Sequence, residues 1–180
     1  MSCHEGCRER SCVVAAGNHL YVCGGVLEDD FFTKAERFDT VENKWEEIAN
    51  MQQARGYACG VANEGKIFVA GGTEDWVSFF KTCELYNIST YEWQFIGSLK
   101  VPRRNGSMAC LKGTLYVLGG LNESQQIELS VECYDPEEEK WIEKTTIPAK
   151  KICKKNNHAY TGCALKLSKG VLDKLQVIKE

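Results

Sequence analysis

The stretch Leu20-Tyr21-Val22-Cys23-Gly24-Gly25 is an apolar run closed by a glycine pair, and it has two counterparts further along the chain. The later copies end at Gly71-Gly72 and Gly119-Gly120, so the steps between copies are 47 and 48 residues. A fixed period of this length is the sequence signature of a repeat architecture. We therefore expect the chain to be built from repeated structural units rather than from one irregular domain.

Three further signatures keep the same period: a glutamate two residues before an aromatic residue, a lone tryptophan, and an arginine that opens each repeat. They lie at Glu36, Glu84 and Glu132, at Trp45, Trp93 and Trp141, and at Arg8, Arg55 and Arg103. Four signatures in one period make chance a poor explanation. Residues 1–150 are accordingly predicted to hold three repeats, at 8–54, 55–102 and 103–150.

Each repeat has the pattern of four short strands. The first is a small-residue apolar run such as 12–16, followed by a turn that contains glycine. The second is continuously apolar, at 20–23, 67–70 and 115–118, which fits a strand buried on both faces. The third ends at the aromatic residue and an Asp or Asn, and the fourth begins at the tryptophan. The sequence thus predicts an all-β protein whose tryptophans pack inside the sheets.

This combination of signatures resembles the kelch repeat, and the resemblance covers residues 8–150. It implies one blade of a β-propeller per repeat, each blade a four-stranded antiparallel sheet. The repeat lengths and the Glu-x-Tyr-Asp form resemble Kelch-like proteins of the BTB–BACK–kelch type. Their propeller captures a substrate for a cullin-RING ubiquitin ligase. No BTB or BACK segment precedes the first repeat, so we expect the C-terminal half of such an adaptor, or a short form that binds without recruiting the ligase.

Residues 151–180 are predicted to form a partial fourth repeat or a C-terminal tail. The segment 156–167 resembles a first strand, but no glycine pair or tryptophan follows it. The spacing within 170–178 fits either a strand or a short helix. Three blades and a fraction are too few to close a ring, because propellers have four to eight blades. The expected fold is an incomplete propeller, completed either by missing blades of a longer protein or by a second copy in a homodimer.

Composition excludes several classes of protein. The net charge of −3 predicts no attraction to nucleic acid, and no apolar stretch reaches the roughly 18 residues of a membrane span. Ten cysteines occur without an export signal, and several lie inside apolar runs, which indicates reduced thiols in a cytoplasmic protein. The alternative of a thiol-based stress sensor rests on Cys7 and Cys153, which lie beside basic residues.

No enzyme signature is present, so catalytic residues, metal ligands and cofactors are not expected. The three histidines are too few for a copper site, and the Cys3-His4-Glu5-Gly6-Cys7 segment lacks a second pair of zinc ligands. No glycine-rich phosphate loop with a lysine occurs. The expected role is a protein-binding module, with an actin- or cytoskeleton-binding kelch protein as the alternative.

The loops after the glycine pairs are one candidate binding site. The middle loop carries three aromatic residues, Trp76, Phe79 and Phe80, and Phe31-Phe32 occupy a similar place in the first repeat. Aromatic side chains are common anchors of protein interfaces. They can equally fill the space between two blades, and the sequence leaves both interpretations open.

The start of each repeat is the second candidate site. In kelch proteins that bind acidic peptides, arginines near this position line the central mouth, and guanidinium groups suit carboxylates or phosphates. The candidates are Arg8, Arg10, Arg55, Tyr57, Arg103, Arg104 and Asn105. A structural ion pair is the alternative for Arg8, Arg55 and Arg103, which repeat unchanged. Arg10, Tyr57 and Asn105 share a register but differ chemically, which favours recognition.

Overall fold

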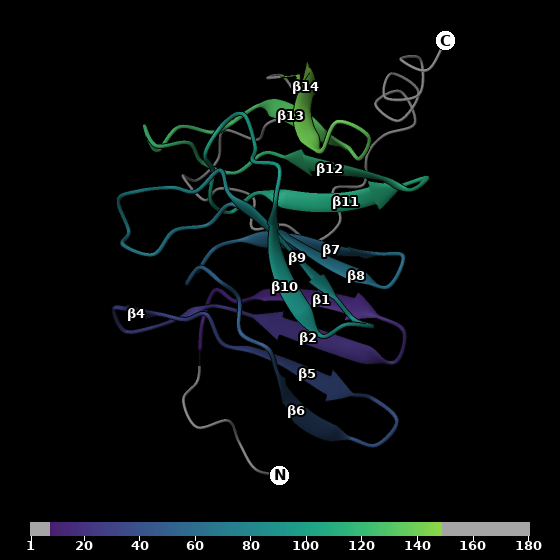
Figure 1. Ribbon diagram of the computed structural model, residues 1–180. Helices are drawn as coiled ribbons and strands as arrows, with labels where there is room; N and C mark the ends of the chain where they lie inside the picture. Colours follow the sequence, from purple (N-terminus) through teal and green to yellow (C-terminus); the bar gives the residue numbers. More distant parts are fainter. Residues whose placement is uncertain (1–7, 149–180) are drawn as a thin grey trace.

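The computed structural model describes residues 8–148, which form three four-stranded antiparallel sheets stacked side by side (Figure 1). Blade 1 contains β1 (Cys12–Ala16), β2 (His19–Cys23), β5 (Ala35–Asp39) and β6 (Lys44–Ile48). Blade 2 contains β7 (Cys59–Asn63), β8 (Lys66–Ala70), β9 (Cys83–Asn87) and β10 (Glu92–Ile96). Blade 3 contains β11 (Ser107–Leu111), β12 (Thr114–Leu118), β13 (Ser130–Asp135) and β14 (Lys140–Thr146). The all-β propeller prediction is confirmed.

Each blade is a meander in which the strands pair in chain order. The first strands, β1, β7 and β11, lie against one another from blade to blade and so form the inner edge of the stack. A two-stranded hairpin, β3 (Val26–Leu27) and β4 (Asp30–Phe31), forms part of the first long loop. The long loops after the glycine pairs and the segments that enter β1, β7 and β11 pair at the same end of the blades. We call this end the loop face.

Two kinds of tight turn lie at the end of the blades opposite the loop face, and the local sequence explains both. The inner hairpins turn on Glu64-Gly65 and Lys112-Gly113, both with positive φ, as a two-residue type I′ turn requires. In the outer hairpins the Asp or Asn of the repeated signature accepts hydrogen bonds from backbone N–H groups two and three residues later. The acceptors are Asp39, Asn87 and Asp135. The regular spacing of this residue along the chain is therefore a turn-forming feature.

The glycine pairs connect neighbouring blades. Gly25 N–H donates to the Arg55 carbonyl at 3.0 Å, and Gly72 N–H donates to the Arg103 carbonyl at 2.9 Å. Gly71 has φ +68°, and a β-carbon there would collide with the Arg103 carbonyl oxygen. The first two pairs thus allow the backbone of the following repeat to approach closely, which only glycine permits.

Two apolar cores lie between the blades. We call the side of a blade that packs on the following blade its front face and the other side its back face. One core joins the front of blade 1, including Cys12 and Tyr21, to the back of blade 2, including Ile67 and Trp93. The other joins the front of blade 2, including Phe68, to the back of blade 3. The stack is held by these two interfaces.

The expectation of buried tryptophans is correct for two repeats and wrong for the first. Trp93 and Trp141 are 7% and 0% exposed, but Trp45 is 42% exposed. The same holds for the second strands: apart from its first residue β8 is buried on both faces, whereas Leu20 of β2 is 38% exposed. The cause is position in the stack, because the back face of blade 1 has no blade before it within residues 8–148.

Candidate partner-binding site

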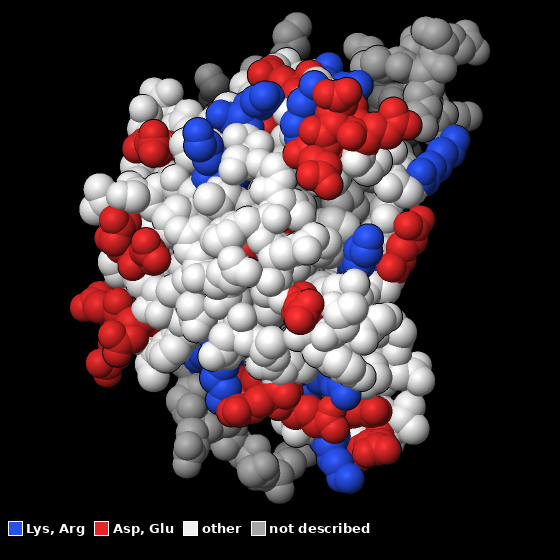
Figure 2. Space-filling view, viewed as in Figure 1, with Lys and Arg blue, Asp and Glu red and all other residues white. Residues whose placement is uncertain are grey.

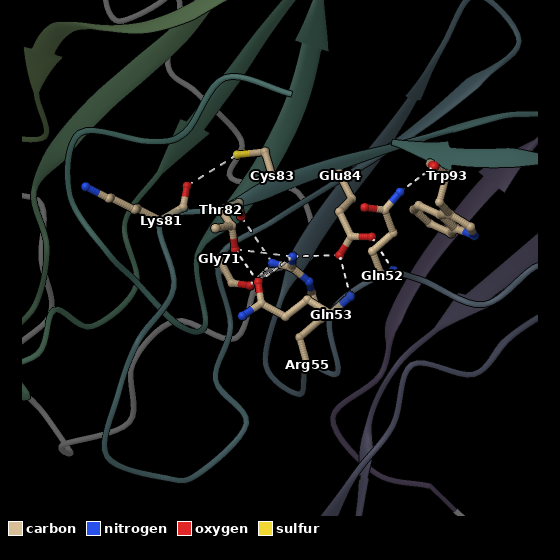
Figure 3. Close-up of polar contacts among 9 residues, drawn as sticks. All are labelled: Gln52, Gln53, Arg55, Gly71, Lys81, Thr82, Cys83, Glu84 and Trp93. Carbon is tan, nitrogen blue, oxygen red and sulfur yellow. Dashed lines mark hydrogen bonds and ion pairs between the residues drawn. The ribbon is translucent and has the colours of Figure 1, made fainter. Parts of the chain in front are cut away.

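The repeat-start arginine of blade 2 lies inside the protein (Figure 3). Arg55 Nη2 is 2.7 Å from Glu84 Oε1, and both side chains are inaccessible to solvent. Arg55 Nη1 also donates to the carbonyls of Gly71 and Thr82. The Glu84 carboxylate accepts the backbone N–H of Gln52 at 2.6 Å, from the segment that leaves blade 1. The buried pair therefore connects two blades.

The other two repeats build the same arrangement. Arg103 Nη2 is 2.6 Å from Glu132 Oε1, again between fully buried side chains, and Glu132 accepts the backbone N–H of Lys100. Arg8 pairs with Glu36. Because a buried charge is costly unless it is paired and hydrogen-bonded, the arginine and the glutamate of the signature must recur together. Each of the three arginines joins the start of its repeat to the glutamate of the same repeat. Arg55 and Arg103 present no exposed surface to a partner.

The varying residues of the same segments lie elsewhere, at the loop face. Arg10, Tyr57 and Asn105 all have left-handed backbones, with φ of 56°, 60° and 55°. Tyr57 N–H donates to the Arg10 carbonyl at 2.9 Å, and Asn105 N–H donates to the Tyr57 carbonyl at 2.8 Å. Each stands two residues before an inner strand, so the three follow one another around the inner edge of the loop face. They are partly or fully exposed.

Arginine and aromatic side chains from all three blades meet at this edge. The Arg10 and Arg104 guanidinium carbons each lie 5.4 Å from the centre of the Tyr57 ring. Trp76 meets the same ring edge-on at 5.6 Å. We call Arg10, Phe31, Tyr57, Trp76, Phe79 and Arg104 the mouth cluster. The two candidate sites of the sequence, the aromatic loop and the repeat start, are thus one site.

Arg104 is fixed in this cluster by three contacts. Its guanidinium carbon lies 4.7 Å from the centre of the Phe79 ring, in addition to the contact with Tyr57. Nη2 donates to Gln125 Oε1 at 2.9 Å. Stacked guanidinium groups retain free N–H edges, so Arg104 is presented rigidly and still carries donors for a carboxylate.

The aromatic residues of the middle loop do not all have the same role: one is exposed, as an interface anchor would be, and the others pack inside the structure. Trp76 is 38% exposed and contacts Phe31 at 5.1 Å between ring centres. Phe79 is buried beneath Arg104, and the Phe80 ring lies 5.5 Å from the Arg55 guanidinium. Trp76 therefore offers contact area, whereas Phe79 and Phe80 support the arginines.

The charge of the loop face changes from its centre to its rim. Arg10 and Arg104 stand at the centre, while the surrounding loops carry the exposed Glu28, Asp29, Asp30, Glu74 and Asp75. Figure 2 shows acidic side chains on the left of the molecule, where Figure 1 places the β3–β4 hairpin and the loop before β9. The Asp75 carboxylate accepts hydrogen bonds from the backbone of Ser78 and Val77, which lower its pKa, so it stays charged near neutral pH.

Two residues of this site were not among the sequence candidates. Phe31 could have been added, because it occupies in the first loop the place of the aromatic residues in the second. Gln125 carried no signal, because a polar residue in a loop of variable sequence has nothing to distinguish it. Both act by holding other members of the cluster, through ring contact with Trp76 and a hydrogen bond with Arg104.

Four buried cysteines lie in environments that suppress reactivity. Burial raises the pKa of the Cys59 thiol to about 11 and that of Cys23 to about 12. Burial also raises the pKa of Cys12 and Cys83. Cys7 and Cys153, on which the sensor alternative rests, lie outside the described residues. Among residues 8–148 no cluster of potential metal ligands occurs, and no helix there could span a membrane.

These features define a class: a stack of propeller blades with structural arginine–glutamate pairs and a variable loop face. The KLHDC2/KLHL20/DRC7 Kelch-repeats domain family matches residues 11–167. The chain belongs to the kelch-repeat family.

Curated relatives agree with this assignment, and one solved structure shares the fold. Human Kelch-like protein 33 is 35% identical over 131 residues, which is 69% of this chain and 24% of that protein. Kelch-like protein 40 of Xenopus laevis is 30% identical over 72% of this chain, and Kelch repeat protein C2 of vaccinia virus is 28% identical over 73%. The chain spans about a quarter of the length of these relatives. The structure of YjhT superposes with a TM-score of 0.69 at 16% identity, covering 79% of this chain and 52% of that one.

Proposed function

We propose that this chain is the substrate-recognition part of a cytoplasmic Kelch-like adaptor for a cullin-RING ubiquitin ligase, and that its mouth cluster binds an acidic peptide segment of the substrate. The family and the Kelch-like relatives support a role in protein–protein interaction. The ligase role rests on the likeness to the BTB–BACK–kelch type.

The observation that carries the binding proposal is the arrangement of Arg10, Tyr57 and Arg104. Two guanidinium groups flank one aromatic ring at the inner edge of the loop face, and Trp76 lies beside them. A carboxylate or phosphate would accept paired hydrogen bonds from either arginine. An apolar residue next to it in the peptide would pack on Trp76, because exposed aromatic rings supply much of the binding energy of interfaces.

The acidic residues of the loops around the mouth cluster would restrict which peptides bind. Glu74 and Asp75 would repel a peptide that is acidic along its whole length. The favoured ligand therefore carries one or two adjacent acidic residues, with neutral or basic residues on either side. Uniformly acidic chains would bind worse despite their larger charge.

Fluorescence anisotropy with labelled peptides tests this proposal. The probes are a peptide with a central Asp-Glu pair, the same peptide with Asn-Gln, and one with acidic residues throughout. The Arg10→Glu/Arg104→Glu variant should lose the binding of the first peptide by tenfold or more. Lys66→Glu, an exposed residue at the start of β8 and at the opposite end of the blade, makes the same kind of charge change and should bind as the parent does. Equal affinity of both variants would refute the mouth cluster as the site.

The ligase role is tested separately. Co-precipitation of a cullin with a BTB-containing parent that carries this segment would support it. Actin co-sedimentation of the chain alone tests the cytoskeletal alternative, and sedimentation with filaments in place of cullin capture would overturn the adaptor proposal.

A further inference from the structure

The middle loop places Trp76 in a backbone conformation that a bulky residue rarely adopts. Its φ is +66°, in the left-handed region. This conformation is unfavourable for a side chain of that size, and it persists only where the surrounding structure imposes it. The hydrogen bonds of the loop and the ring contacts of Trp76 are the surroundings that impose it here.

Two side chains close the turn that contains this residue. Asp75 Oδ1 accepts the backbone N–H of Ser78 at 2.6 Å and that of Val77 at 3.0 Å. The Thr73 hydroxyl donates to the Ser78 carbonyl at 2.7 Å. Thr73 is itself buried, and its backbone exchanges two hydrogen bonds with that of Gly56. The turn is therefore joined to the first segment of blade 2.

The ring of Trp76 reaches from this turn onto the loop of blade 1, where it meets the Phe31 ring edge-on at 5.1 Å. A glycine makes room for this contact, because a β-carbon on Gly56 would lie 3.1 Å from the Phe31 ring. The residue equivalent to Gly56 in blade 3 is Arg104, since both form a bridge to the loop that follows the glycine pair of their own repeat. The Arg104 guanidinium lies over Phe79. Gly56 thus leaves to Trp76 the place that an arginine occupies in the next repeat.

We propose that Asp75 is a positioning residue of the mouth cluster: its carboxylate holds the turn that presents Trp76, already packed on Phe31 and Tyr57, to a bound peptide. A side chain that is fixed before binding loses less conformational entropy when the peptide binds, so its contact contributes more to affinity. Asp75 therefore favours binding through its oxygen atom, although its negative charge opposes uniformly acidic peptides. This role rests on the proposed function for its ligand, whereas the position of Trp76 can be measured without one.

Two substitutions separate the oxygen atom of Asp75 from its charge. Asp75→Asn keeps an acceptor at the same position and removes the charge, whereas Asp75→Ala removes both. In the anisotropy assay with the Asp-Glu peptide, Asp75→Ala should weaken binding about two- to tenfold, the cost of immobilising one side chain on binding. Asp75→Asn should bind at least as tightly as the parent and should discriminate less against the uniformly acidic peptide.

The control for charge is Glu74→Ala, which removes an exposed acidic residue one position earlier in the same loop and should not weaken binding. Equal weakening by Asp75→Asn and Asp75→Ala would show that the charge and not the turn is responsible, and the proposal would fail. The double variant Asp75→Ala/Trp76→Ala should bind as Trp76→Ala alone does, because the turn then has no anchor to present. Additive losses would show that Asp75 does not act through Trp76 and would overturn the proposal.

Nuclear magnetic resonance of the 180-residue chain without peptide measures the position of Trp76 directly. Nuclear Overhauser contacts from its indole to the Phe31 and Tyr57 rings should be present in the parent and in Asp75→Asn, and lost in Asp75→Ala. Contacts that persist in Asp75→Ala overturn the positioning role whatever the peptide does. If the contacts are lost while the parent, Asp75→Ala and Trp76→Ala bind the peptide equally, the turn positions Trp76 as inferred and the proposed function fails instead.

Discussion

Arg103 and Arg104 are neighbours in sequence and differ completely in environment. Arg103 is buried with Glu132 and joins two blades, whereas Arg104 lies on the loop face against two aromatic rings. The first belongs to the repeated pattern, and the second has no equivalent in the other repeats. The comparison teaches that in this chain repetition marks the residues that build the blades, whereas the residue next to a repeated one is left on the loop face when it departs from the pattern.

The strongest test of this division removes the repeated arginine. Arg103→Ala leaves the Glu132 carboxylate buried without its counter-ion, so the free energy of unfolding should fall by about 3–5 kcal/mol. Urea denaturation followed by tryptophan fluorescence measures the loss. Arg37→Ala breaks the partly exposed pair with Glu46 and should cost about 1 kcal/mol or less. Similar losses for the two variants would show that Arg103 is not structural.

A second test concerns the glycine pairs, which are also repeated. Gly71→Ala should destabilise the protein by about 2 kcal/mol more than Gly65→Ala. Both residues have a positive φ, but a β-carbon on Gly71 collides with the Arg103 carbonyl, while one on Gly65 meets open space. Thermal or urea unfolding of the two variants isolates the cost of the collision. An equal cost would mean that φ alone explains the glycine pair.

For a residue that varies between repeats, we expect a smaller effect, on binding and not on stability. Trp76→Ala removes an exposed anchor, so the affinity for the Asp-Glu probe peptide should fall about tenfold, in the range of interface hot spots. The urea midpoint should stay at its parent value. Val77→Ala, at the next position of the same loop and 74% exposed, is the control. A loss of stability without a loss of binding would place Trp76 with the structural residues.

The smallest effect, little or no reaction with a thiol reagent, is expected at four buried cysteines. A pKa of about 11 at Cys59, against an ordinary value of 9.0, leaves about a hundredfold less thiolate at neutral pH. Iodoacetamide at pH 8 should therefore leave Cys12, Cys23, Cys59 and Cys83 unlabelled in the folded chain and label them in urea, as read by mass mapping. Because the folded pKa is raised, stability should hold below pH 9 and fall as the pH rises towards 11. Rapid labelling of any of the four in the folded chain would show that burial does not protect its thiol.

The fold could be predicted from the sequence because the residues that specify a blade recur in all three repeats. The glycine pair, the Asp or Asn before the outer turn and the tryptophan each specify a local geometry, and their common period gives the blades. The exposure of Trp45 could not be predicted in the same way. Burial depends on the neighbouring blade and not on the residue's own repeat.

The sequence indicates the members of the candidate site only as separate parts. Arg10, Tyr57 and Asn105 were identified by their shared register, and Trp76 by its unusual loop. Their meeting depends on the path of that loop, which bends where Asp75 accepts the backbone N–H groups of Val77 and Ser78 and where Trp76 itself has φ +66°. The third loop also turns on a side-chain oxygen, that of Asn122, which accepts the backbone N–H groups of Ser124 and Gln126. The loops differ in sequence, so the repeat period does not predict where their side chains meet.

The backbone chain from Arg10 through Tyr57 to Asn105 has a consequence for how such a protein can evolve. Main-chain hydrogen bonds join the three positions, which share a left-handed backbone conformation although their side chains differ. Exchange of one side chain for another therefore leaves the scaffold unchanged while it alters what the mouth presents. Lineages that duplicate such a gene could acquire new partners by neutral drift at three codons, without passing through an unstable intermediate.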